Sequence, residues 1–116
     1  MAAITLYHNK NCSTSRKALA RLEDTGADFD VVEYLKHPLT KAELGRLVDA
    51  IDSPPADLVR KDPKFKALGL DPADYTSKTA VVALLVEHPE LMQRPVLVKG
   101  TTGLIARPVE RVDELL

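Results

Sequence analysis

Residues 4–22 read ITLYHNKNCSTSRKALARL, and this stretch decides the fold class. Its first residues alternate apolar and polar side chains, which predicts a short strand over Ile4–Tyr7 that runs into a polar loop. Ser13-Thr14-Ser15 offers capping hydroxyls, and leucines at helical spacing follow until Gly26, a residue typical of helix ends. The stretch therefore predicts a strand, a loop and a helix, with Cys12 at the start of the helix.

The elements that follow complete an α/β pattern. Phe29–Leu35 is rich in β-branched and aromatic residues and predicts a second strand, which the helical crossover would place parallel to the first in a right-handed unit. Residues 40–90 read as mostly helical. They include a capping box from Thr40 to Glu43, a short helix near Ala56–Arg60 and a firm helical period over Ser77–Glu87.

The last part of the chain returns to strands. Val96–Val98 and Leu104–Ala106 predict an antiparallel hairpin, and Pro108 suits the first turn of a final helix. The order is βαβ, a helical block over about residues 40–90, then ββα. This order predicts an α/β fold of the thioredoxin-like class, a single domain over residues 1–116 with a mostly helical insertion between its second and third strands.

Composition excludes several classes of function. The 116 residues carry 16 basic and 17 acidic side chains, so the net charge of −1 gives no reason to expect nucleic acid or an anionic membrane as a partner. The longest apolar run, Ala80–Val86, is far shorter than the roughly 20 residues that span a bilayer. The N-terminal residues lack the pattern of a signal peptide. We expect a cytoplasmic protein that acts as a monomer.

Cysteine content restricts the chemistry further. Cys12 is the single cysteine, and three scattered histidines are too few to complete a structural zinc site with it, so no metal is expected. The unpaired amides of a first helical turn stabilise an anion, and His8, Lys10 and Arg16 would add positive potential. Such surroundings favour a reactive thiolate over a buried, inert thiol. Because position 15 is serine, an oxidised Cys12 needs an external thiol.

Three arginines are candidates for binding an oxyanion beside Cys12. In a thioredoxin-like order the residue before the third strand is commonly a cis proline, and Pro95 holds that place, so Arg94 would point toward the thiol. Arg107 ends the next strand and Arg60 ends a short helix. Taken singly, each would be an ordinary surface arginine, but together they would form a site, because arginine donates paired hydrogen bonds to phosphate-like oxygens.

These motifs together carry a resemblance that covers nearly the whole chain. The segment YHNKNCSTSR at residues 7–16 resembles the active-site motif of the glutaredoxin-coupled arsenate reductases. Further motifs follow in the order and spacing of that family: Glu33-Tyr34-Leu35, Leu58-x-Arg60-Lys61, Glu87-His88-Pro89, Arg94-Pro95 and Arg107-Pro108.

The resemblance implies a mechanism and roles. Cys12 would attack arsenate or a similar oxyanion, Arg60, Arg94 and Arg107 would hold the oxyanion, and His8, Ser15 and Arg16 would support the thiolate. Glutathione as co-substrate and a glutaredoxin as partner would complete the reduction to arsenite, with no bound cofactor.

Two alternatives remain at this point. One is a glutathione-dependent thiol reductase of the same family that does not act on arsenate and need not use all three arginines. The other is a non-enzymatic redox or transcription regulator that binds RNA polymerase. Many such relatives carry a second cysteine where this chain has Ser15, which argues against that form.

Overall fold

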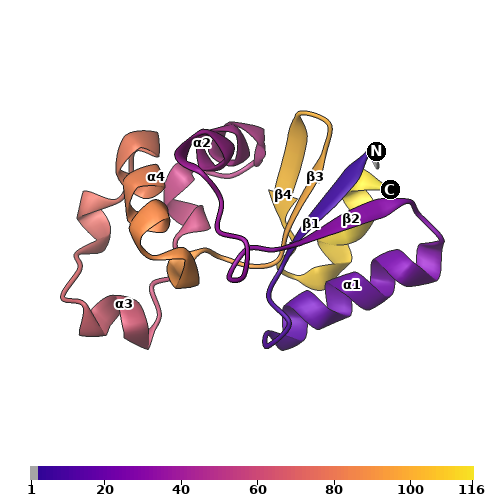
Figure 1. Ribbon diagram of the computed structural model, residues 1–116, viewed down its shortest axis with the longest axis horizontal. Helices are drawn as coiled ribbons and strands as arrows, with labels where there is room; N and C mark the ends of the chain where they lie inside the picture. The colour runs from indigo at the N-terminus through magenta and orange to yellow at the C-terminus, as the bar shows by residue number, and fades with distance from the viewer. Residues whose placement is uncertain (1–2) are drawn as a thin grey trace.

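The computed structural model describes residues 3–116, and its centre is a four-stranded mixed sheet with helices on both faces (Figure 1). The strands are β1 (Ile4–His8), β2 (Phe29–Glu33), β3 (Val96–Lys99) and β4 (Thr102–Ile105). They lie in the order β2-β1-β3-β4. β1 pairs with β2 in parallel, and the other two pairings are antiparallel. The thioredoxin-like α/β fold that the sequence predicts is confirmed.

One face of the sheet packs on α1 (Ser13–Thr25) and on the C-terminal 3-10 helix η4 (Val109–Leu115). Leu6 of β1 and Leu97 of β3 meet Leu22 of α1 and Val112 of η4 in this core, and all four are fully buried. α1 ends at Gly26, whose φ of 71° is the left-handed conformation that glycine adopts without strain. This core fixes α1, and so Cys12, relative to the end of β1.

The opposite face carries the helical insertion, which Figure 1 shows apart from α1. Its elements are α2 (Lys41–Ala50), η1 (Pro55–Leu58), α3 (Pro63–Ala67), η2 (Pro72–Asp74), α4 (Lys78–Glu87) and η3 (Pro89–Leu91). Alternate strand residues such as Val96 and Ile105 face this side and pack with buried leucines and valines of α2 and α4. The capping box of α2 is present as predicted, because the Thr40 hydroxyl accepts from the Glu43 amide.

Three elements differ from the expectation. The second strand ends at Glu33 instead of Leu35, because the Glu33 carbonyl accepts from the amides of Lys36 and His37 and turns the chain. The short helix expected near Ala56–Arg60 is the 3-10 helix η1, which leaves Arg60 outside it. The final helix is also 3-10 rather than α.

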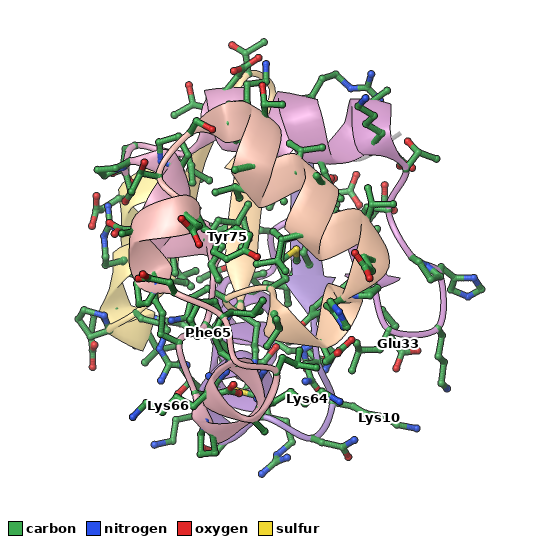
Figure 2. All side chains as sticks on the ribbon, turned by 90° about the vertical axis from the view of Figure 1, so that its left-hand side faces the viewer. Lys10, Glu33, Lys64, Phe65, Lys66 and Tyr75 are labelled. Carbon is green, nitrogen blue, oxygen red and sulfur yellow. The ribbon has the colours of Figure 1, made fainter. Side chains whose placement is uncertain are left out.

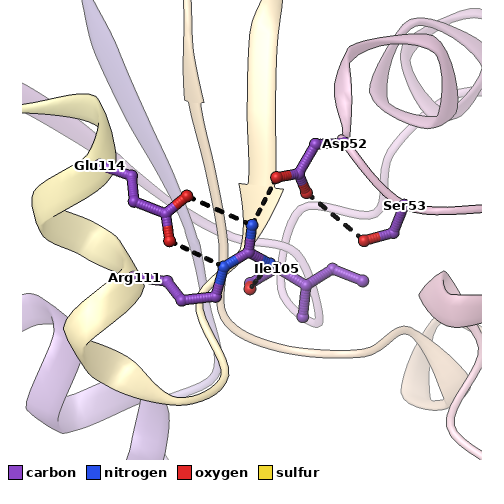
Figure 3. Close-up of polar contacts among 5 residues, drawn as sticks. All are labelled: Asp52, Ser53, Ile105, Arg111 and Glu114. Carbon is purple, nitrogen blue, oxygen red and sulfur yellow. Dashed lines mark hydrogen bonds and ion pairs between the residues drawn. The ribbon is translucent and has the colours of Figure 1, made fainter.

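Arg111 ties η4 to both the sheet and the insertion (Figure 3). Its guanidinium donates to the Ile105 carbonyl at the end of β4, with Nη1 and O 3.1 Å apart. It also pairs with Asp52 after α2 and with Glu114 in η4. The residue therefore links three segments that are distant in the chain. Within residues 3–116, none of the helices has the length and apolarity needed to cross a membrane.

Candidate functional site

Cys12 is the residue at which the loop after β1 becomes α1. It is the N-cap of the helix, and no side chain caps the first turn, so the prediction that the hydroxyls of residues 13–15 cap it is wrong. The loop is held by its own backbone, since the Cys12 amide donates to the Asn9 carbonyl at 3.0 Å and the Asn11 amide to the Asn9 side chain at 2.9 Å. The uncapped amides of the first turn are therefore free to act on the half-buried thiol.

Ser15 holds the loop from the inside. Its fully buried hydroxyl accepts from the Asn9 amide at 3.0 Å and lies 2.6 Å from His8 Nδ1. Burial lowers the pKa of His8, with further effects from Glu33, Arg16 and Ser15, so the imidazole is neutral near neutral pH. Ser15 can then donate its proton to Nδ1. The expectation that His8 adds positive charge is wrong; its contact with Ser15 shapes the loop instead.

The Cys12 thiol is biased toward its anionic form. Burial raises its pKa. Hydrogen bonds lower it, and they come from the Ser15 amide, the Arg94 side chain and the Thr14 amide. Together with the positive charge of Arg94, these hydrogen bonds outweigh the effect of burial. The net result is a thiol pKa below its ordinary value. This is the combination of helix amides and a nearby cation that produces nucleophilic cysteines.

Arg94 is the arginine that reaches Cys12. It lies just before β3, the strand that pairs with β1, and the Arg94–Pro95 peptide is cis, a question that the sequence left open. Its Nε is buried and has no hydrogen-bond partner. The topology therefore brings a guanidinium from residue 94 to a thiol at residue 12, with donor capacity left for a ligand.

The other two arginines are linked to Arg94 and its neighbour Gln93, and not to the Cys12 sulfur. Arg60 contacts Asp62 through Nε and the Gln93 side chain through Nη1, both at 3.4 Å. Arg107 is exposed and donates to the Arg94 carbonyl at 3.0 Å. Neither acts on the Cys12 thiol in the way that Arg94 does. The three predicted arginines are thus neighbours in a cluster, and Arg94 is the one that lowers the pKa of the thiol.

Arg16 supports the loop instead of the sulfur. Its guanidinium is exposed and donates to the Lys10 carbonyl at 2.9 Å. Lys10, Lys64 and Lys66 lie along the lower edge of the molecule in Figure 2, the edge at which Figure 1 places the loop that holds Cys12.

Three further residues take part in the cluster, and sequence reasoning missed them. Gln93 accepts from both the Arg60 side chain and the Arg94 amide, because backbone hydrogen bonds join residues 58–60 to residues 91–93. Asp62 caps α3 and pairs with Arg60. Tyr34 is buried, and the charges of Arg94, Cys12 and Arg60 all act on its phenol. Of the three, Asp62 alone carries a local signal, since an Asp followed by Pro63 is typical of a helix start.

The cluster borders a groove. A cavity of about 430 Å³ is lined by Gln93 and Arg107 together with Ser53, Asp57, Val59, Lys61, Ile105 and Arg111. Another cavity, of about 460 Å³, lies between β1 and α2 and contains none of the predicted site residues. Within the described residues 3–116, no three His, Cys, Asp or Glu side chains gather as metal ligands would. The polar groups around Cys12 suit a small anion.

Comparison with known proteins agrees with this arrangement. The model of the ArsC family matches residues 7–115. The chain is 37% identical to an arsenate reductase of Rhizobium meliloti over 97% of this chain and 81% of that protein. It is 33% identical to an arsenate reductase of Neisseria meningitidis serogroup A, with both chains fully covered. A solved arsenate reductase from Vibrio cholerae superposes with a TM-score of 0.86 at 35% identity, covering 97% of each chain. This chain belongs to the ArsC family.

Proposed function

We propose that the chain is an arsenate reductase, an oxidoreductase in which the Cys12 thiolate is the nucleophile. The observation that carries the proposal is the place of Arg94 just before β3, whose Val96 pairs with Tyr7 near the end of β1, so that its guanidinium lowers the pKa of the Cys12 thiol. A thiolate beside a guanidinium with a free donor can attack an oxyanion that the same guanidinium holds. The full-length relatives named as arsenate reductases support arsenate as that oxyanion.

The first step forms a bond between sulfur and arsenic. Arg94 binds the arsenate oxygens, and the long contacts of Arg60 with Asp62 and Gln93 are weak enough for an incoming anion to replace them. Arg107, held on the Arg94 carbonyl, adds positive charge at the rim. The thiolate attacks arsenic in line with a leaving oxygen, which departs as water after protonation. Arsenic is still pentavalent in this adduct.

The reduction itself takes two electrons. Two thiol groups supply them by forming one disulfide, while arsenic becomes trivalent and leaves as arsenite. The sequence has one cysteine, so at least one of the two thiols comes from outside the chain. We propose glutathione as this co-substrate and a glutaredoxin as the partner that removes glutathione from the mixed disulfide. The groove beside Arg107 and Lys61 offers positive charge to the carboxylates of glutathione.

One observation favours a second candidate, a glutathione-dependent thiol reductase. Of the three arginines only Arg94 contacts the thiol, and a thiol reductase needs an activated thiolate but no three-arginine cradle. Such an enzyme would form a mixed disulfide between Cys12 and glutathione in its normal cycle. Arsenate would play no part in it.

A coupled assay separates the two functions. Arsenate-dependent oxidation of NADPH is followed with glutathione, glutaredoxin and glutathione reductase for the wild type and for Cys12→Ser. The reductase proposal predicts turnover that saturates with arsenate and is lost in Cys12→Ser. Arg94→Ala should lose arsenate turnover more than reduction of a glutathione mixed disulfide. Absence of arsenate turnover, with Cys12 still exchanging with glutathione, would instead support the thiol reductase.

A further inference from the structure

Two buried polar atoms at the site lack hydrogen-bond partners. They are the Tyr34 hydroxyl and Arg94 Nε, the two such side-chain atoms among residues 3–116. Buried polar groups are usually paired, because an unpaired one loses its hydration without replacement. Glu33 pairs with His8 and Val96 pairs with Tyr7, so Tyr34 and Arg94 both lie at the edge of the sheet where β1 ends, and the charges of Arg94 and Cys12 act on the Tyr34 phenol there.

The fold places the Tyr34 hydroxyl at this point and holds it there. Glu33, the last residue of β2, pairs with His8, the last residue of β1, so Tyr34 leaves the sheet at the edge where the loop to Cys12 begins. The tyrosine is only 1% exposed and belongs to the core cluster of the helical insertion. Phenylalanine would serve such a core equally well, so packing does not account for the hydroxyl.

The groups near the phenol leave its proton without an acceptor. The Asn9 side chain acts on the phenol oxygen, although it does not reach ordinary hydrogen-bond geometry. Its carbonyl oxygen accepts from the Asn11 amide at 2.9 Å, and its effect is to lower the pKa of Tyr34, as a donor does, so the Asn9 NH₂ group is the one that faces the phenol. Arg94 has donors alone. Asn9 and Arg94 therefore present donors to the phenol, and the Cys12 sulfur lies beyond hydrogen-bond distance of it, so the Tyr34 proton has no acceptor within reach.

We propose, on the basis of the arsenate reductase function proposed above, that the Tyr34 hydroxyl is an oxyanion-binding group that donates a hydrogen bond to an arsenate oxygen shared with Arg94. A tetrahedral oxyanion supplies acceptors on several oxygens and can satisfy both buried donors at once. Burial, the largest effect, raises the pKa of Tyr34, so the phenol keeps its proton at neutral pH. Tyr34 thus supplies a neutral hydrogen-bond donor to the oxyanion, in addition to the charged donors of the arginines.

Arsenate binding tests this role without any chemistry at sulfur. Isothermal titration with arsenate compares Cys12→Ser with Cys12→Ser/Tyr34→Phe, in which the ring is kept and the hydroxyl removed. We expect the dissociation constant to rise about tenfold or more, the usual effect of losing a hydrogen bond to a charged group. Tyr75→Phe is the matched control, since the Tyr75 ring packs edge-on against Phe65 in the insertion and should leave arsenate affinity unchanged.

Two further readouts distinguish ligand binding from a structural role. Without arsenate, Tyr34→Phe should unfold in urea at an unchanged or higher concentration, because it removes an unpaired buried hydroxyl. With Cys12 intact, the variant should raise KM for arsenate and leave the pH profile of Cys12 alkylation unchanged. Equal arsenate affinity and equal KM with and without the hydroxyl would overturn the role of Tyr34 while the reductase function stands. Absence of arsenate turnover in the wild type would overturn the function, and the role of Tyr34 with it.

Discussion

At the scale of single residues, the reactivity of Cys12 depends on which groups reach its sulfur. The Ser15 and Thr14 amides and the Arg94 side chain do so and lower the pKa of the thiol against the opposing effect of burial. His8 lies four residues before Cys12 and Arg16 four residues after it, yet both act on the loop and not on the sulfur. Proximity in sequence is therefore a poor guide to which cation stabilises the thiolate.

Arg94→Ala should raise the pKa of the Cys12 thiol. The variant removes both a hydrogen bond and a positive charge from the thiolate, so the neutral thiol is favoured. Measured by iodoacetamide alkylation across a pH series, the midpoint should move toward or above the ordinary value of about 8.5. Arg21→Ala, which removes an exposed ion pair with Asp113, is the control and should leave the midpoint unchanged. An alkylation midpoint that is the same in Arg94→Ala and in the wild type would contradict the role of Arg94 in lowering the pKa of Cys12.

His8 should make the stability of the fold depend on pH. Burial lowers its pKa in the folded state below the value of about 6.5 expected when unfolded, so the unfolded chain binds more protons in the interval between the two values. The free energy of unfolding should therefore rise with pH through that interval and fall as the pH drops through it. Urea unfolding of His8→Gln should show a flatter dependence. The exposed His37→Gln should keep the slope of the wild type, and equal slopes for all three proteins would refute this account.

At the scale of elements, the connection between β1 and α1 is organised by one buried serine. Ser15 accepts from the Asn9 amide and contacts His8, so it joins the last residue of the strand and the first of the loop to the first turn of the helix. The loop that presents Cys12 is thus fixed from within the protein. The exposed contact of Arg16 with the Lys10 carbonyl adds to it from outside.

Ser15→Ala should destabilise the protein by roughly 1–3 kcal/mol. The substitution leaves the buried Asn9 amide without an acceptor, which costs its full desolvation penalty. Urea unfolding measures the change. Ser13→Ala, at an exposed position in the same turn, should stay within about 0.5 kcal/mol of the wild type. Comparable losses in the two variants would show that the buried hydrogen bond is not the cause.

The starts of helices α2 and α1 show what the sequence could and could not predict. The capping box from Thr40 to Glu43 was predictable because it needs only four neighbouring residues. Ser13-Thr14-Ser15 carries the same local signal, but Ser15 turns inward to His8 and the helix stays uncapped. Whether a hydroxyl caps a helix or turns inward depends on what the sheet places beside it. Local pattern does not contain that information.

At the scale of the whole molecule, one sheet separates two cores and brings distant residues to a common edge. The order of the elements along the chain, the parallel first pair of strands, the final hairpin and the place of Arg94 before the third strand followed from the sequence, because alternation and turn residues determine the elements. The contacts of Arg60 and Arg107 did not follow. They depend on backbone bonds between residues 58–60 and 91–93 and on the Arg94 carbonyl. The role of the Tyr34 hydroxyl did not follow either, because it depends on the charges of Arg94 and Cys12, which are distant in the sequence and near in the fold.

Arg111→Ala should loosen the link between the two halves of the molecule. The side chain joins η4 to the Ile105 carbonyl and to Asp52 after α2 (Figure 3). The loss of one backbone hydrogen bond and of two partly exposed ion pairs should cost about 1–2 kcal/mol in urea unfolding. Arg21→Ala removes an exposed pair only, so its effect should be smaller. A loss no greater than that of Arg21→Ala would mean that the link contributes little.

The most direct test of the central claim is a measurement of the product. Wild-type protein and Cys12→Ser are incubated with arsenate, glutathione and glutaredoxin, and arsenite is quantified over time by chromatographic separation of the arsenic species. If the Cys12 thiolate beside Arg94 is the nucleophile, the wild type forms arsenite in many turnovers and Cys12→Ser forms none above the protein-free reaction. Equal arsenite from both proteins, or none from the wild type while Cys12 still reacts with glutathione, would contradict the account.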